Sequence, residues 1–430
     1  MKRTFLISIL LFTLFSASAQ DEKSVLAQSA YKAEIDKISR DKKVRKAFDI
    51  IQELEPATMK ELIELTEIPA PPFMEQKRAE RFRQMLQEAG IDTIWIDEAG
   101  NVLALRKGKG NGKTILFEGH LDTVFPIETD VTVKMKGDTL FAPGIGDDTR
   151  ALSVVITVLK GMNKAGIATE SDILIAGTVG EEGLGDLRGI KHLFQSGKIK
   201  IDSHIALDGG DIDRLSINGL GSLRYKITFK GPGGHSWGAF GLANPHHAMG
   251  KAIDYFNTAA GAFVASGPKT SYNVGRIGGG TSVNSIPFET WMEVDMRSLS
   301  PEKLKGIEQI LHNQINKALN DYNSGIKTGA KLTAHFEKIG ERPSGLQAEN
   351  LPLIQKAMAT IEYFKAKPAL GTGSTNSNIP ISLGVPSITI GRGGKGGDAH
   401  SLDEWWINEN GAEAIKFALL ILIAEAGLVQ

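Results

Sequence analysis

Short apolar segments that alternate with helical segments are the feature that most constrains the fold of this chain. The apolar segments are four to seven residues long, which suits strands buried in the middle of a sheet. Strands are expected at 114–119, 172–178, 204–207 and 386–390, and helices at 149–164, 350–364 and 409–426. The alternation predicts an α/β domain in which helices cover both faces of a mixed, largely parallel sheet.

The segment that precedes this alternation has helical and strand patterns of its own. Helices are expected at 23–54 and 75–89, and strands at 92–97 and 101–107. The prolines between 69 and 72 separate the two helices, because proline ends a helical pattern.

The pattern changes near Gly219, where apolar and polar residues begin to alternate along a half-exposed strand. The expected elements there are strands at 223–230, 271–277, 289–297 and 331–338 and helices at 244–258 and 301–320. This order suits a ferredoxin-like α+β domain inserted into the larger one. We therefore expect the catalytic domain at 20–218 and 343–430, and the inserted domain at 219–342.

Residues 1–19 resemble an export signal. Lys2 and Arg3 precede an apolar run, and Ala17-Ser18-Ala19 offers a small-x-small cleavage site. The run is too short to span a bilayer comfortably. We expect an exported protein, periplasmic or secreted, that has no membrane contact after cleavage; the alternative is an uncleaved N-terminal anchor.

Composition limits the chemistry. The formal net charge of −1 gives no indication of a nucleic-acid partner. The chain has no cysteine, so any metal must be held by histidines and carboxylates.

Histidine and acidic residues follow the expected strands, where open α/β sheets bind their ligands. His120 and Asp122 follow the strand at 114–119, and Glu181-Glu182 follows 172–178. Asp208 follows the next strand, and a glycine-rich loop leads from the last one to His400. Asp147-Asp148 lies in a glycine-bounded loop before a helix. Together these residues predict a metal site at one edge of the sheet.

The spacing also indicates different roles. Adjacent glutamates diverge, which suits one ligand and one free base at Glu181-Glu182. Asp122 is close enough to His120 to orient its imidazole. Imidazole and carboxylate ligands fit zinc, with cobalt or manganese as substitutes.

From about residue 56 to its end, the chain resembles the di-zinc metallopeptidase family that includes glutamate carboxypeptidase, peptidase T, carnosine dipeptidase, aminoacylase and acetylornithine deacetylase. The motifs that carry the resemblance are G-H-L-D-T-V, A-P-G-I-G-D-D, G-E-E-G, L-D-G-G, G-P-G-G-H-S and A-H-S-L-D-E. The resemblance implies a dizinc hydrolase of peptide or amide bonds.

The resemblance also implies residue roles. One zinc would be held by His120, Asp147 and Asp208, and the second by Asp147, Glu182 and His400. Asp147 would bridge the two, Asp122 would orient His120, and Glu181 would be the general base.

In the inserted domain, the resemblance implies a dimerisation or lid function, and we expect a homodimer. His235 resembles a histidine that reaches the active site of the neighbouring subunit. Asn284, Arg297 and, more weakly, Arg342 match polar positions around the substrate.

The chain departs from the family pattern in two places. Thr149-Arg150 stands where Lys-Gly is usual after the two aspartates, and Asn376 stands where an aspartate is common. We expect Asn376 near the substrate rather than on a metal.

The substrate is less constrained than the metal site. The aspartate at 208, in an L-D-G-G context, favours an exopeptidase that acts on short peptides from their N-terminus. The alternatives are an N-acyl-amino-acid amidohydrolase or a carboxypeptidase of the same family and, more distantly, an inactive metal-binding homologue.

Overall fold

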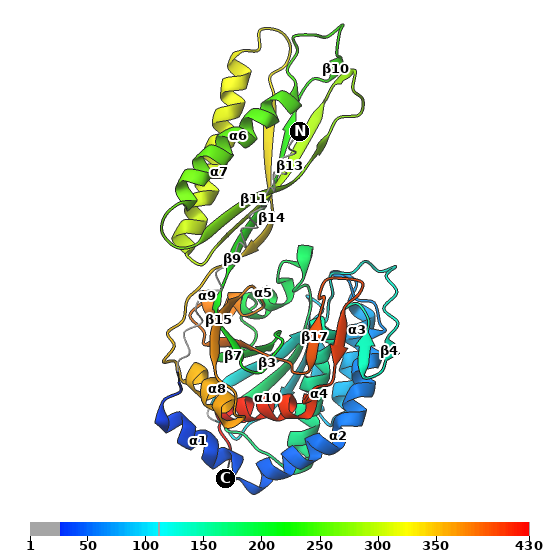
Figure 1. The fold of residues 1–430 in the computed structure, drawn as a ribbon, viewed down its shortest axis with the longest axis vertical. Helices are drawn as coiled ribbons and strands as arrows, with labels where there is room; N and C mark the ends of the chain where they lie inside the picture. The colour runs from blue at the N-terminus through cyan, green and yellow to red at the C-terminus, as the bar shows by residue number, and fades with distance from the viewer. Residues whose placement is uncertain (1–25, 111, 430) are drawn as a thin grey trace, which may run out of the picture.

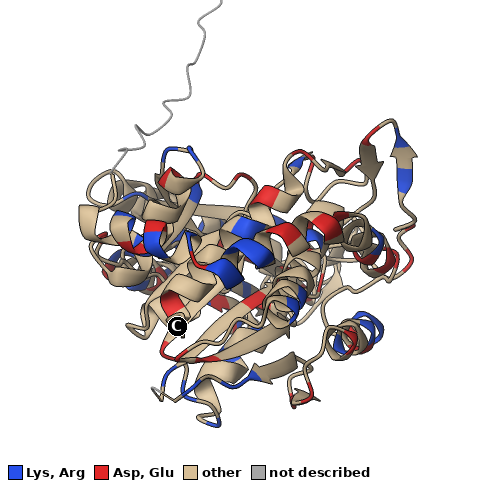
Figure 2. Cartoon of the chain, turned by 90° about the horizontal axis from the view of Figure 1, so that it is seen from below, with Lys and Arg blue, Asp and Glu red and all other residues tan. Residues whose placement is uncertain are grey.

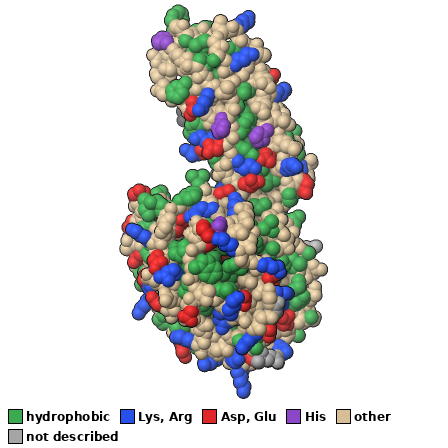
Figure 3. All heavy atoms as spheres, turned by 180° about the vertical axis from the view of Figure 1, so that it is seen from behind, with side chains coloured by type: hydrophobic (Ala, Val, Ile, Leu, Met, Phe, Trp, Pro, Cys, Tyr) green, Lys and Arg blue, Asp and Glu red, His purple; other side chains and the backbone are tan. Residues whose placement is uncertain are grey.

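A computed structural model describes residues 26–110 and 112–429, so the expected leader at 1–19 lies outside the described residues. The chain folds into a larger part, built around an eight-stranded sheet, from which a smaller part projects (Figure 1). Figure 3 shows the smaller part standing clear of the larger one.

The large sheet has the strand order β1-β2-β6-β3-β7-β16-β8-β15. β6, β3, β7 and β16 are parallel neighbours, whereas β1, β2 and β8 run antiparallel to an adjacent strand. The strands are β1 (Ile94–Ile96), β2 (Val102–Arg106), β3 (Thr114–His120), β6 (Asp172–Thr178), β7 (Ser203–Leu207), β8 (Arg214–Gly219), β15 (Ala369–Gly373) and β16 (Ser387–Ile390). The expectation of a mixed, largely parallel sheet is confirmed.

Helices cover both faces of this sheet. The helices of the larger part are α1 (Ser29–Ser39), α2 (Lys42–Thr66), α3 (Gln76–Glu88), α4 (Arg150–Ala165), α5 (Arg188–Gln195), α8 (Pro352–Tyr363), α9 (Asn378–Ser382) and α10 (Gly411–Ala426). On β3, Ile115 and Phe117 pack into the core shared with α3, α4, α8 and α10, whereas Leu116 faces the core beside α5. This alternation follows from the two-residue period of a strand.

The structure corrects two expectations about local elements. The single helix expected at 23–54 is two helices, because Asp41 caps a new one by accepting from the backbone N–H of Lys43 and Val44. The second helix then continues through Pro56 to Thr66. The last two strands of the sheet order, β8 and β15, were not expected, because their Gly-, Ser- and Asn-containing sequences lack a strong apolar pattern.

The projecting part is a four-stranded antiparallel sheet in the order β11-β13-β9-β14, with two helices packed on one face. Its elements are β9 (Gly221–Lys230), α6 (Pro245–Val264), β11 (Thr270–Gly279), β13 (Glu289–Ser298), α7 (Pro301–Ser324) and β14 (Thr333–Arg342). A short pair, β10 (Gly234–His235) with β12 (Ser285–Ile286), lies at its free end (Figure 1).

A third small sheet lies beside the carboxyl ends of the large one. It has the order β17-β18-β5-β4, with β4 (Lys134–Lys136), β5 (Thr139–Phe141), β17 (Lys395–Gly397) and β18 (Trp405–Ile407). Two single helical turns, at Ile145–Thr149 and Gly183–Gly185, complete the loops at this edge.

Viewed from below, the helices carry basic and acidic residues interspersed with one another (Figure 2). This mixed distribution agrees with the near-zero net charge. Among the described residues, no helix is both long and apolar enough to cross a membrane.

One buried cation ties the strand that carries His120 to the helices beside it. Arg78, on α3, is fully buried, and its guanidinium donates to the carbonyl oxygens of Thr66, Ile68 and Leu121. Three charge-assisted bonds to backbone fix the exit of β3 against the end of α2. The position of His120 therefore depends on packing as well as on the sheet.

Candidate metal centre

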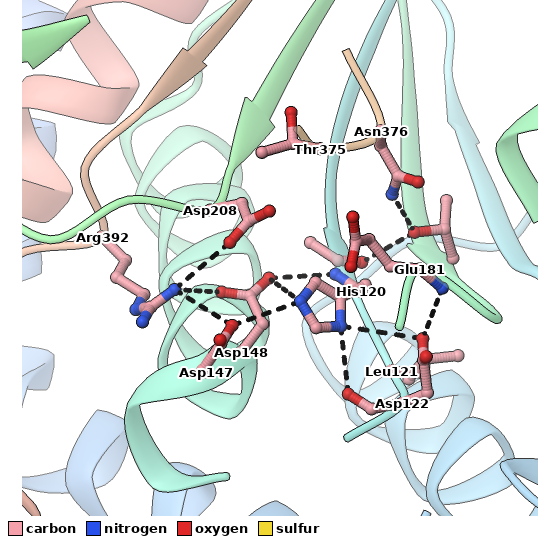
Figure 4. A network of polar contacts seen from close by, with 12 residues as sticks. His120, Leu121, Asp122, Asp147, Asp148, Glu181, Asp208, Thr375, Asn376 and Arg392 are labelled. Carbon is pink, nitrogen blue, oxygen red and sulfur yellow. Dashed lines mark hydrogen bonds and ion pairs between the residues drawn. The ribbon is translucent and has the colours of Figure 1, made fainter. Parts of the chain in front are cut away.

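Four adjacent parallel strands end at the same edge of the sheet and carry most of the predicted site. His120 is the last residue of β3, Glu181 follows β6 by three residues, and Asp208 directly follows β7. The loop after β16 brings His400 to the same place. Figure 4 shows His120, Asp147 and Asp208 pointing toward one another from different elements.

The donor atoms of these residues form overlapping groups. In one group, donor atoms of His120, Asp147, Asp148 and Asp208 lie within 4.8 Å of one another. Asp147, Glu182 and His400 form another group under the same limit, with His400 Nε2 3.2 Å from Asp147 Oδ2 and 2.8 Å from Glu182 Oε1. A third group contains His120, Glu181 and Glu182. The structure thus brings the five residues predicted as ligands together, and Asp147 belongs to two of the groups.

The bare site holds more negative charge than its surroundings favour. Burial, followed by the proximity of Asp147, raises the pKa of Asp208 well above its usual value. Burial likewise raises the pKa of Asp148, against the effect of His120. Carboxylates in such a place ionise readily only beside a cation. The donor set therefore fits a divalent metal.

The surroundings of His120 also fit a metal ligand. Its Nε2 is buried and has no hydrogen-bond partner among the described residues, although Asp147 Oδ1 lies 3.3 Å away. Its Nδ1 lies 3.0 Å from the backbone oxygen of Asp122 and 3.6 Å from the Asp122 carboxylate. Nδ1 is thus held by Asp122, while Nε2 faces the acidic cluster, as expected for a metal ligand.

Asp122 also organises the loop that carries the two glutamates. Its Oδ1 accepts from the backbone N–H of Glu181 at 2.9 Å, and its Oδ2 accepts from that of Glu182 at 2.8 Å. Burial alone would raise the pKa of Asp122, but bonds from His120 and these two amides hold it below its usual value. The sequence predicted a role for Asp122 in orienting His120; the structure adds these bonds to the glutamate loop.

The loop that carries Asp147 is fixed by Glu404. This buried carboxylate accepts from the backbone N–H of Gly144 at 2.7 Å and from those of Gly146 and Asp147 at 2.9 Å. Gly144 has φ 79°, and a Cβ there would lie 2.5 Å from Thr123 Cγ2, so only glycine fits. Glu404 was not predicted, although it is the last residue of the A-H-S-L-D-E motif.

Glu181 is buried beside the cluster and contacts a cation from the inserted domain. Arg342 Nη1 lies 2.9 Å from Glu181 Oε1 and also donates to the backbone oxygen of Ser374 at 2.8 Å. Burial raises the pKa of Glu181 to about 7, and Arg342 opposes this shift. Arg342 was expected around the substrate; the structure buries it against Glu181 at the end of β14.

His235 and Asn284 lie next to each other but far from this cluster within one chain. The backbone N–H of Ser236 donates to the backbone oxygen of Asn284 at 2.9 Å, and His235 pairs with Ser285 across β10 and β12. Figure 1 places β10 at the free end of the inserted domain. The exposed side chains of Trp237, Phe240 and Val283 belong to the same loops, and hydrophobic side chains are visible near this end in Figure 3.

The other two expected substrate contacts have different surroundings. Arg297 lies at the end of β13, opposite Ser222 in the sheet, and its Nε contacts Asp295 at 2.8 Å. Asn376 is buried, and its amide donates to Glu118 and, at 2.9 Å, to Thr178 Oγ1. The amide donors of Asn376 are thus engaged within the protein, and its expected place near the substrate stays a prediction.

Two charged residues of the cluster were not predicted as site residues. Asp148 is fully buried, and its Oδ2 accepts from the backbone N–H of His120 at 3.0 Å. Arg392 places Nη1 3.2 to 3.5 Å from carboxylate oxygens of Asp147, Asp148 and Asp208 (Figure 4). The sequence signal for Arg392 is its position in the loop directly after a buried strand.

The model of peptidase family M20/M25/M40 matches residues 116–424 of this chain. Among curated proteins, the chain is 22% identical over 348 residues to succinyl-diaminopimelate desuccinylase of Corynebacterium glutamicum, covering 79% of this chain and 89% of that protein. It is 32% identical over 125 residues to a LysW-lysine/LysW-ornithine hydrolase of Pyrococcus abyssi, but that match spans 29% of this chain and only 33% of the relative.

Solved structures share the fold at low identity. A tripeptidase from Staphylococcus aureus has a TM-score of 0.69 and 18% identity, covering 86% of this chain and 97% of that one. A dinuclear metal-binding peptidase from Bacillus subtilis has a TM-score of 0.63 and 16% identity, covering 87% of this chain and 99% of that one.

Metal content of purified variants tests the sharing of Asp147 between the two donor groups. Asp147→Ala should lose both equivalents of metal, because each group loses a ligand. His400→Ala should keep about one, since only the group with Glu182 is broken. His192→Ala, at a surface histidine paired with Glu98, is the control and should keep both. Equal loss from Asp147→Ala and His400→Ala, measured by elemental analysis, would contradict the shared position.

Proposed function

The chain belongs to peptidase family M20/M25/M40, and from that premise we propose that it is a zinc-dependent exopeptidase that hydrolyses short peptides. The observation that supports this most is the pair of donor groups that share Asp147, with Glu181 buried beside them. The proposed ligands of one zinc are His120, Asp147 and Asp208, and those of the other are Asp147, Glu182 and His400.

When bound, such a metal pair supplies a water of lowered pKa and polarises the carbonyl of the scissile bond. Glu181 is the proposed general base. Its carboxylate oxygen that does not contact Arg342 takes the proton from the attacking water and passes it to the nitrogen of the leaving amine. A pKa near 7 suits a group that both accepts and donates a proton at neutral pH.

The remaining residues hold this base in place. Asp122 accepts from the backbone N–H groups of both Glu181 and Glu182, and Arg342 holds one oxygen of the Glu181 carboxylate. Because Arg342 is the last residue of β14, a movement of the inserted domain changes the surroundings of the base directly.

His235 is proposed to act in the active site of a partner subunit. Within its own chain it lies at the free end of the inserted domain, away from the cluster (Figure 1). A neighbouring imidazole can donate to the developing oxyanion of an amide under attack. The exposed apolar side chains in the same loops suit burial against a second copy.

Peptides are the first candidate substrates, and acylated amino acids are the second. The tripeptidase with the same fold supports the first class. The desuccinylase, which is similar over most of both chains, supports an amidohydrolase that removes acyl groups. The two classes differ on the carbonyl side of the scissile bond, which is a residue with a free amine in a short peptide and an acyl group in an acylated amino acid.

A substrate panel separates these classes. Free tripeptides, N-blocked dipeptides and N-acetyl or N-succinyl amino acids would be compared by kcat/KM with zinc-loaded protein. The proposal predicts the highest value for free short peptides. Equal values for free and N-blocked peptides would contradict N-terminal recognition, and a preference for acyl amino acids would establish the second candidate.

Glu181→Gln tests the general base. The substitution keeps the shape of the side chain but removes the basic oxygen, so kcat should fall by about 10²–10⁴-fold. Metal content should stay at the wild-type level, whereas Glu182→Ala should lose metal. A Glu181→Gln protein with metal bound and near-normal kcat would exclude the proposed role.

Mixing two inactive variants tests the action of His235 across subunits. Glu181→Gln and His235→Ala should each be poorly active alone. If His235 serves the partner, co-expressed chains with different purification tags will form heterodimers that contain one site with both residues intact. Purified heterodimers should then regain a substantial share of wild-type activity. Absence of any gain, with the heterodimer verified by mass, would rule out this arrangement.

A further inference from the structure

Arg392 contacts all three aspartates of the group with His120, whereas in the group with Glu182 and His400 it contacts only the shared Asp147. Its Nη1 lies 3.5 Å from Asp147 Oδ1, 3.2 Å from Asp148 Oδ1 and 3.5 Å from Asp208 Oδ1. No ion pair between Arg392 and Glu182 is found among the described residues. The side chain is only 13% exposed, so water screens these interactions weakly.

Hydrogen bonds on both sides of Arg392 fix its backbone, so its guanidinium is held close to the aspartates. Its N–H donates to the Gly209 oxygen at 3.1 Å, directly after Asp208. Its own carbonyl oxygen accepts from Arg150 Nε at 3.4 Å, and Arg150 lies over the ring of Trp406. Thr149 and Arg150 stand where the family pattern has Lys-Gly. Thr149 is uncharged and donates to the Gly144 oxygen. The Arg150 guanidinium donates to the carbonyl oxygens of Arg392 and Gly411, and among the described residues it forms no ion pair with the three aspartates.

The guanidinium side chain has space behind it. A cavity of about 700 Å³ is lined by Arg392 together with Gly146, Asp211, Lys395, Glu404 and Trp405. A side chain that leaves Asp147 and Asp208 can therefore turn toward this cavity without disturbing the core.

We propose that Arg392 is a built-in counter-cation that neutralises Asp147, Asp148 and Asp208 in the metal-free protein and competes with metal for the His120–Asp147–Asp208 group. The two metal positions are therefore unequal. The group with Glu182 and His400 fills first, and the group beside Arg392 fills second and more weakly. Arg392 keeps its contact with Asp148 and releases the other two aspartates as the second metal enters. The inference rests on the proposed ligand set but not on the substrate.

Calorimetric titration of metal-free protein with zinc, in the full chain, tests this. The wild type should show two separate binding steps. Arg392→Met should tighten the second step by at least about tenfold, because a positive charge close to the ion is removed. The first step should change little. Arg392→Lys keeps the charge and should keep the two steps apart.

Lys395→Met is the matched control, because Lys395 lines the same cavity but makes no described contact with the three aspartates. It should leave both steps at wild-type values. Thermal melting adds a readout that does not depend on affinity. In chelator, Arg392→Met should melt below the wild type, since the aspartates lose their cation, and saturating zinc should remove the difference.

Three results would overturn the proposal. Unchanged or equally weakened steps in Arg392→Met, with two equivalents bound by the wild type, would show that Arg392 does not compete with metal. If Arg392→Met lowers the melting temperature equally with and without zinc, Arg392 stabilises the fold by packing and not by neutralising the aspartates. A wild type that binds no zinc would refute the ligand set itself, and with it this proposal.

Discussion

Repulsion among buried carboxylates is the constraint on which the rest of the structure depends. Asp147, Asp148 and Asp208 converge with Glu181 and Glu182 at the ends of parallel strands, and burial raises the pKa of several of them. Such an arrangement is unfavourable unless cations are close by. The fold supplies two fixed cations, Arg392 and Arg342, and leaves donor atoms of histidine and carboxylate facing one another. A divalent metal completes the neutralisation.

Three charged side chains hold this unfavourable cluster in place through hydrogen bonds to the backbone of the segments that carry it. Glu404 fixes the Asp147 loop, Asp122 fixes the glutamate loop, and Arg78 fixes the exit of the strand that carries His120. Each of these groups is charged and buried, and each is satisfied mainly by backbone N–H or C=O groups. The positions of the donor atoms are therefore set before any metal binds, as preorganised sites require.

The sequence predicts the scaffold and the cluster well, because both follow from local patterns. Neighbouring parallel strands have their carboxyl ends at the same edge of the sheet, so the residues at the ends of β3, β6 and β7 must lie close together there. The same rule places Arg392 at this edge, two residues after β16, but no local pattern encodes its contacts with the distant aspartates or those of Glu404 with the Asp147 loop. The place of Asn376 near the substrate stays a prediction; its amide donates to the buried Glu118, a contact that its local motif does not encode. The strands β8 and β15 owe their place to neighbours rather than to their own composition.

In the proposed site, two metal ions share Asp147 at the ends of these strands. Anomalous scattering from a crystal of the zinc-loaded protein, recorded on both sides of the zinc absorption edge, tests it most directly. We expect two zinc peaks with Asp147 between them, one beside His120 and Asp208 and the other beside Glu182 and His400. A single peak, or a second peak away from Asp147, would contradict it.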